Sequence, residues 1–79
     1  MNKADQATVK GALEVRARTN TKMGSSEYEI PAGTIGYIIA SRAGKDHIVY
    51  WTGLMPHYKG DHRTSIHVMG DLEPTGRRG

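Results

Sequence analysis

Apolar and polar residues alternate with a period of two in four segments of the chain, and this alternation predicts β-strands. In the first segment, residues 9–19, Leu13, Val15 and Ala17 alternate with charged residues, which predicts one buried and one charged face. The second segment, "TIGYIIAS" at residues 34–41, is largely apolar on both faces, as expected for a strand in the centre of a sheet. These two segments already favour a mainly β domain.

The third segment, "HIVYWT" at residues 47–52, is rich in β-branched and aromatic residues, which are typical of strands. We expect Val49 and Trp51 to face the core, with Tyr50 facing outward. The polar stretch "RAGKD" at residues 42–46 is expected to connect this strand to the preceding one as a hairpin.

The fourth segment, "RTSIHVM" at residues 63–69, is predicted to be a strand with Ile66 and Val68 in the core and His67 on the surface. The following "GDLEP" predicts a single tight turn that buries Leu72 and closes the domain.

Two long polar stretches, "NTKMGSSEYE" at residues 20–29 and "GLMPHYKGD" at residues 53–61, are expected to be loops. Between the first loop and the second strand lies "IPAGT". Its Pro31 and Gly33 predict a type I turn.

A chain of 79 residues has room for one domain. We expect a flexible N-terminal segment at 1–10, a small β-barrel at 11–74 and a basic flexible tail at 75–79. A short helix through Val9, ended by Gly11, is the alternative for the first segment. An OB-type barrel and a dimer sharing one sheet are the alternatives for the architecture.

The succession "VRAR", a long loop, "IPAGTIGYI", "HIVYW" and "DLEP" resembles the small barrels related to Src-homology and KOW domains, over roughly residues 12–74. The resemblance implies an all-β fold: a small, strongly bent five-stranded barrel with a closing single-turn helix. That group includes RNA-associated modules, subunits of electron-transfer complexes, phage and plasmid proteins, and the plasmid-type dihydrofolate reductase. "SIHV" stands where that reductase has its pore-lining "VQIY" segment, so the resemblance implies a fold and leaves function open.

The net charge of +3 invites a nucleic-acid interpretation, but two of the positive charges, Arg77 and Arg78, lie in the terminal "TGRRG". Cysteine is absent, so the chain has no disulfide and no thiolate ligand or nucleophile. The first twenty residues contain no apolar run, so neither a signal peptide nor a membrane span is expected. We therefore expect a cytoplasmic protein.

Three histidines, His57, His62 and His67, stand five residues apart, and His47 opens the third strand. This spacing matches no metal-binding pattern, so no metal is expected, and the histidines are interpreted as loop and surface groups. No serine lies in an activated context and no glycine run could hold phosphate. We therefore expect a protein without catalytic activity and without a cofactor.

Aromatic and basic residues of the long loops indicate a binding surface. Tyr28 and Tyr58 could face each other across a groove, or could simply pack over the ends of the barrel. The first hypothesis is a non-enzymatic module that binds a protein partner, for example a component of nucleic-acid-handling machinery. Its predicted contact residues are Tyr28, Met55, His57, Tyr58, Lys59 and Arg63.

Direct binding of DNA or RNA is the second hypothesis, through a basic strand face and the tail. A solvated strand face, kept charged against aggregation, explains the same arginines. The residues concerned are Lys10, Arg16, Arg18, Lys22, Arg77 and Arg78. A third hypothesis is a homo-oligomeric barrel with a ligand site on its symmetry axis. Partner identity, oligomeric state and a phage or plasmid origin stay open at this level.

Overall fold

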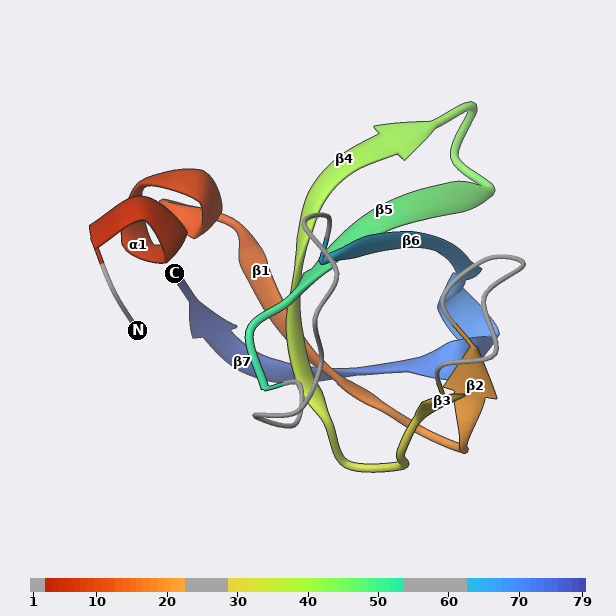
Figure 1. The fold of residues 1–79 in the computed structure, drawn as a ribbon. Coiled ribbons are helices and arrows are strands. Elements are labelled where there is room, and N and C mark those ends of the chain that lie inside the picture. The colour runs from red at the N-terminus through yellow and green to blue at the C-terminus, as the bar shows by residue number, and fades with distance from the viewer. Residues whose placement is uncertain (1–2, 23–28, 54–62) are drawn as a thin grey trace.

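The protein is described from a computed structural model, which places residues 3–22, 29–53 and 63–79. Within these ranges, five antiparallel strands form one sheet in the order β6-β5-β4-β1-β7, and β2 pairs with β3 in a second, small sheet (Figure 1). The elements are α1 (Lys3–Val9), β1 (Leu13–Ala17), β2 (Thr21–Lys22), β3 (Glu29–Ile30), β4 (Ile35–Arg42), β5 (Asp46–Trp51), β6 (Thr64–Val68), the 3₁₀ helix η1 (Met69–Asp71) and β7 (Leu72–Arg78).

The predicted all-β class is confirmed, and so is the central position of the strand "TIGYIIAS". This strand is β4, which pairs with β1 on one side and β5 on the other. It curves strongly along its length, and the whole sheet bends with it (Figure 1). The two edges of the sheet, β6 and β7, are not paired with each other among the described residues.

Trp51 is the largest of the fully buried side chains that form the core. The predicted burial of Val49 and Trp51 is confirmed, because neither side chain is exposed. The Trp51 ring lies directly over Gly36, where an added Cβ would come within 2.6 Å of Cε3 of the ring. Only glycine leaves room for this ring. The other buried members are Val15, Ala17, Ile30 and Leu72, with Ile38 packed against them.

The predicted phase of the fourth strand is wrong. Ser65 and His67 of β6 are buried, with 6% and 5% of their surface exposed, whereas Ile66 and Val68 are each 51% exposed. The cause is register, because Ser65 lies opposite the buried Val49 and must share its face.

Two turns set the geometry around β4. The predicted type I turn is wrong: the Thr34 N–H donates to the Pro31 carbonyl, and Gly33 at the third position has φ +88°, as in a type II turn. The predicted hairpin after β4 is confirmed. Its two central residues, Ala43 and Gly44, both have positive φ, which matches the twist of the flanking strands.

The N-terminal residues expected to be flexible form α1, the helix that was the alternative. Val9 at its end is fully buried, and the Tyr50 hydroxyl donates to the Asp5 carboxylate at 2.6 Å. That hydrogen bond, together with burial, raises the pKa of Tyr50. The helix packs against β4, so the outward face around Tyr50 is partly covered. Across the described ranges, no helix has the length and apolar character needed to cross a membrane.

The residues expected to form a flexible tail belong to β7 instead. The strand runs to Arg78, and Gly79 forms two backbone hydrogen bonds beyond it. The Gly79 N–H donates to the Ala12 carbonyl, and its carbonyl accepts from the Gly11 N–H. The end of β7 therefore lies beside the end of α1 (Figure 1).

Candidate functional site

The first edge of the sheet, β6, has β5 as its only neighbour among the described strands. The Trp51 N–H donates to the Arg63 carbonyl, which fixes the alternation of the ladder between the two strands. In an antiparallel pair every second residue is hydrogen-bonded to its partner, so Ser65 and His67 point their backbone groups at β5. The N–H and C=O of Ile66, at the centre of β6, therefore point away from the sheet.

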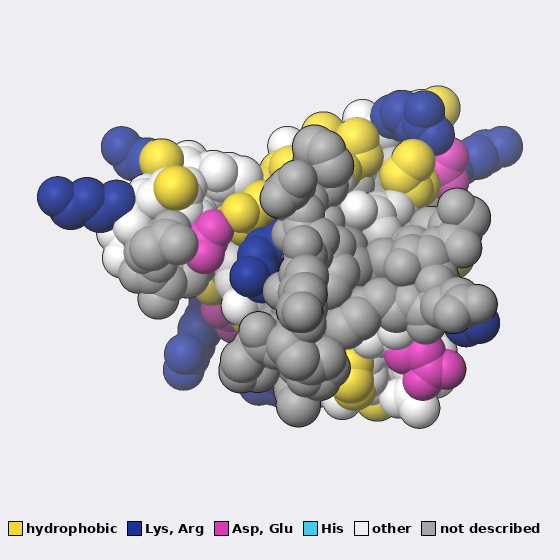
Figure 2. Space-filling model, in the orientation of Figure 1, with side chains coloured by type: hydrophobic (Ala, Val, Ile, Leu, Met, Phe, Trp, Pro, Cys, Tyr) yellow, Lys and Arg dark blue, Asp and Glu magenta, His cyan; other side chains and the backbone are white. Residues whose placement is uncertain are grey.

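The side chains on the outer face of β6 are those of Thr64, Ile66 and Val68, and all three are exposed. Ile66 and Val68 have half of their surface in solvent, and Ile66 lies opposite the half-buried Ile48 of β5. Figure 2 shows hydrophobic side chains gathered along the upper rim of the molecule, over β4 and β5, with Lys and Arg side chains near the hairpin that joins them. No residue of β6 carries a formal charge when His67 is neutral.

The opposite edge, β7, is built differently. It contains Glu73, Arg77 and Arg78, and its Pro74 has no N–H to offer to another strand. The pairing of β7 with β1 is also interrupted by a register shift between Leu13 and Val15. Charges, proline and bulges are the devices that keep an edge strand from pairing with a further strand. Such devices are present on β7 and missing from β6.

The inner face of β6 carries a buried polar chain that begins at Trp51. The Trp51 Nε1–H donates to Ser65 Oγ at 2.7 Å, and Ser65 Oγ lies 2.5 Å from His67 Nε2. The His67 ring stands edge-on to the indole, with centroids 5.4 Å apart. On its other side, His67 Nδ1 lies 4.0 Å from an Asp71 carboxylate oxygen. Each buried polar atom of Trp51, Ser65 and His67 thus has a neighbour within reach.

Burial lowers the pKa of His67 below its ordinary value, and Asp71 opposes this only in part. The neutral ring then accepts a hydrogen bond from the Ser65 hydroxyl at Nε2 and turns its Nδ1–H toward Asp71. A serine in contact with a histidine that is in turn oriented by an aspartate is also the arrangement that activates a nucleophile in enzymes. Here the Ser65 hydroxyl is buried and occupied by the indole N–H, so this conformation presents no oxygen to a substrate.

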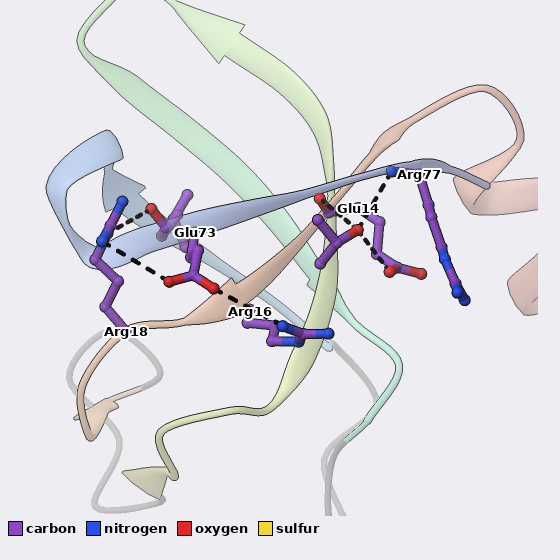
Figure 3. Close-up of polar contacts among 7 residues, drawn as sticks. Glu14, Arg16, Arg18, Glu73 and Arg77 are labelled. Carbon is purple, nitrogen blue, oxygen red and sulfur yellow. Dashed lines mark hydrogen bonds and ion pairs between the residues drawn. The ribbon is translucent and has the colours of Figure 1, made fainter.

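The basic face predicted from the sequence is partly neutralised. Figure 3 shows Glu73 of β7 between two arginines of the β1 segment. Its two carboxylate oxygens lie 3.8 Å from Arg16 Nη1 and 3.9 Å from Arg18 Nη1. The Arg18 side chain also donates from Nε to the Leu72 carbonyl at 3.0 Å. Arg18 is therefore partly occupied in holding η1 and β7 against β1.

Glu14 forms a second polar cluster on the same face. Its carboxylate accepts hydrogen bonds from Thr75 at 2.7 Å and from Tyr37 at 2.9 Å. These bonds, with Arg77 and Arg16 nearby, lower the pKa of Glu14, against the effect of burial. The Arg77 N–H in turn donates to Thr75 Oγ1 (Figure 3). The cluster ties β7 to β1 and β4.

The remaining residues of the predicted basic surface do not form one stripe with Arg16 and Arg18. Lys10 follows α1 and Lys22 lies in β2, at opposite ends of the molecule (Figure 1). Lys22 lies opposite Glu29 in the small sheet. Arg78 donates from Nη1 to the Gly11 carbonyl at 3.0 Å, which holds the end of β7 to the end of α1.

The predicted loop groove falls almost wholly outside the described residues. Those outside are Tyr28, Met55, His57, Tyr58 and Lys59. Arg63 is described; it is half-buried and its carbonyl accepts from Trp51 at the start of β6. The groove itself stays a prediction.

Sequence reasoning missed Ile66 and Val68 as exposed groups, although one signal was present. A buried tryptophan needs an acceptor for its indole N–H, and Ser65 is an uncharged side chain that can supply one on a neighbouring strand. Placing Ser65 inward forces Ile66 outward, because neighbouring residues of a strand face opposite sides.

Comparison with family models, with curated proteins and with solved structures gave no significant match.

Proposed function

We propose that this domain is a non-enzymatic protein-binding module that receives an extended segment of its partner along β6. One observation carries the proposal: β6 is uncharged and lies at the edge of the sheet formed by the described strands, and its central residue, Ile66, turns both its backbone groups and an exposed side chain outward. In strand addition, main-chain hydrogen bonds provide affinity and the alternating side chains provide specificity.

The partner segment that fits this edge is extended and apolar on one face. Thr64, Ile66 and Val68 offer β-branched side chains on the outer face, which pack well against β-branched or aromatic cross-strand neighbours. A charged partner strand is a poorer fit, since β6 has no charge to compensate it.

Direct binding of nucleic acid is less well supported. Glu73 lies between Arg16 and Arg18, so a phosphate would have to compete with an existing carboxylate for both guanidinium groups. Catalysis by Ser65 is also poorly supported, since its hydroxyl is engaged by Trp51 in the core.

The finer description of the fold belongs to the same proposal. The order β6-β5-β4-β1-β7, with a 3₁₀ helix between β6 and β7, supports a five-stranded barrel of the Src-homology type. A cytoplasmic setting is proposed with it, because the sequence contains no cysteine.

The test starts from peptides selected on the immobilised domain from a random display library, so that no natural partner need be known. Affinities of the selected peptides are then measured for the native protein, for Ile66→Lys and for the control Ile39→Lys. Ile39 is also a partly exposed isoleucine, but it lies on β4, away from the edge. We expect Ile66→Lys to weaken binding about tenfold or more and Ile39→Lys to change it about twofold at most.

If both variants weaken peptide binding equally, or if neither variant weakens it, binding along β6 is contradicted. A parallel titration with duplex DNA and with single-stranded RNA, at low and at moderate salt, covers the alternative. Tight, strongly salt-dependent binding that is lost in Arg16→Ala would favour the nucleic-acid hypothesis instead.

A further inference from the structure

The sequence of β6 is complementary to itself, and we infer that the strand it receives is β6 of a second copy of this chain. The two strands run antiparallel about a two-fold axis at Ile66 and join the two five-stranded sheets into one. This inference rests on the proposed function, because it names the partner for the same edge.

The backbone geometry fits this pairing. The N–H and C=O of Ile66 point away from β5, so Ile66 of each copy can donate its N–H to the carbonyl of Ile66 in the other. A hydrogen-bonded pair at the centre of a two-fold axis needs the same residue to have both groups available. Ile66, the third of five residues in β6, meets that condition.

The side chains fit it as well. Antiparallel pairing about Ile66 places Ile66 opposite Ile66 of the second copy, and Thr64 opposite Val68 of the second copy. All three outer-face residues are β-branched, and such cross-strand pairs stabilise antiparallel sheets. The half-buried Ile48, opposite Ile66 within each copy, continues the apolar stripe on both sides of the axis. The pairing therefore covers side chains that a single copy leaves half in solvent.

The charges also permit it. In a two-fold pairing centred on Ile66, a residue on one side of Ile66 lies opposite the residue equally far on the other side in the second copy. A strand whose residues carried charges of one sign would therefore repel its own copy. No residue of β6 carries a formal charge. Arg63, the nearest charged residue before the strand, comes opposite Met69 of the second copy and not opposite another arginine.

The composition of β7 explains why the assembly closes at two copies. Head-to-tail pairing of β6 with β7 of the next copy would leave free edges and grow without limit. Pro74 removes one N–H from β7, and Glu73, Arg77 and Arg78 place charges along it. The β6 edge therefore finds a better partner in another β6 than in β7.

The first test measures molecular mass by sedimentation over protein concentrations from about 5 µM to 1 mM, a range in which mass action reveals a modest dimer. We expect the native protein to pass from monomer to dimer, and to stop at dimer. Ile66→Lys should weaken this self-association about tenfold or more, and the control Ile39→Lys about twofold at most. Circular dichroism and melting curves establish that each variant is folded.

The second test uses the absence of cysteine from the chain. Cα atoms of a hydrogen-bonded antiparallel pair are about 5.5 Å apart, a separation that a disulfide can span. Mild oxidation of Ile66→Cys should therefore give a covalent dimer that keeps the native spectrum. Ile39→Cys, oxidised alongside it, should stay monomeric.

A native protein that stays monomeric throughout the range overturns the inference, as does a dimer that Ile66→Lys leaves unchanged. Neither result decides the proposed function, which is judged by the affinity of selected peptides at the same edge. A monomer whose peptides bind along β6 leaves the proposed function standing and removes only the second copy as its partner. If no selected peptide binds the native protein along β6, the proposed function itself is overturned.

Discussion

At the scale of single residues, the Trp51 side chain decides which way β6 faces. Its ring fills the core and its N–H needs an acceptor, which Ser65 supplies from the neighbouring strand. His67 follows on the same face because it is two residues further along the strand. Ile66 and Val68 are left outside as the consequence, and they become the candidate binding residues.

Substitutions in this chain of contacts should separate packing from hydrogen bonding. Trp51→Ala should cost about 3–5 kcal/mol of unfolding free energy, because it leaves a large cavity. Ser65→Ala should cost about 1–3 kcal/mol, because it leaves the indole N–H without an acceptor. Urea denaturation measures both. An unchanged midpoint for Ser65→Ala would contradict the role given to the hydroxyl.

The pH dependence of stability should carry the signature of His67. Burial lowers the pKa of His67 in the folded state, so the unfolded chain binds the proton more readily. Stability should therefore fall as the pH decreases below about 6.5, the ordinary value, toward the lower folded-state pKa. Denaturation midpoints from pH 7.5 to pH 5 measure this trend.

Two variants assign that trend to its residue. His67→Gln, which keeps polar atoms near Ser65, should flatten the dependence. His47→Gln removes the histidine directly opposite on β5 and should leave the dependence in place. If His47→Gln flattens it and His67→Gln does not, the buried position of His67 is not its source. A separate loss below about pH 4.5 is expected from Glu14, whose pKa is lowered and whose charged form is therefore stabilised.

At the scale of elements, β7 holds the two ends of the described chain together. Just beyond the strand, backbone hydrogen bonds join Gly79 to Gly11 and Ala12, and the Arg78 side chain donates to the Gly11 carbonyl. The sequence predicted a flexible tail here, and "TGRRG" contains no apolar residue that would indicate packing. The contribution of this segment is made by its backbone, which leaves no trace in a hydrophobic pattern.

Truncation after Thr75 should therefore destabilise the domain. We expect a drop of about 4–8 °C or more in Tm, corresponding to the loss of at least 1 kcal/mol of backbone and packing interactions. Arg77→Ala is the matched control, because it removes an exposed side chain and keeps the strand. If the truncated protein has the same Tm as the control, the strand beyond Thr75 contributes nothing to stability.

Elements could be predicted from the sequence where one face is clearly apolar. The strands containing Val15 and Val49 were predicted with their core faces because burial decides their phase. The strand containing Ile38 was predicted to be central, with both faces apolar and neither assigned to the core. The strand at 63–69 was located but turned over, because a serine and a histidine in the core contradict hydrophobicity. β2 and β3 were not predicted, since two-residue strands leave no periodicity to read. For the same reason, the sequence did not predict Ile66 and Val68 as candidate binding residues.

At the scale of the whole molecule, the two edges of the bent sheet have opposite properties. The β7 edge is protected by proline, charge and a register shift, and α1 lies at its end. The β6 edge is uncharged, with an exposed apolar face. Within the described residues, the five-stranded sheet has one protected edge and one edge without such protection, and the unprotected edge is suited to receiving a single further strand.

Amide hydrogen exchange at Ile66 tests this account most directly. In the monomer the Ile66 N–H points away from β5 and has no strand partner among the described residues, while those of Ser65 and His67 are bonded to β5. We predict that Ile66 exchanges rapidly in dilute protein and becomes protected when a strand is bound, whether from a selected peptide or a second copy. Ser65 and His67 should be protected in both states. Binding that leaves the Ile66 amide unprotected, and slows exchange elsewhere, would contradict the assignment of β6 as the binding edge.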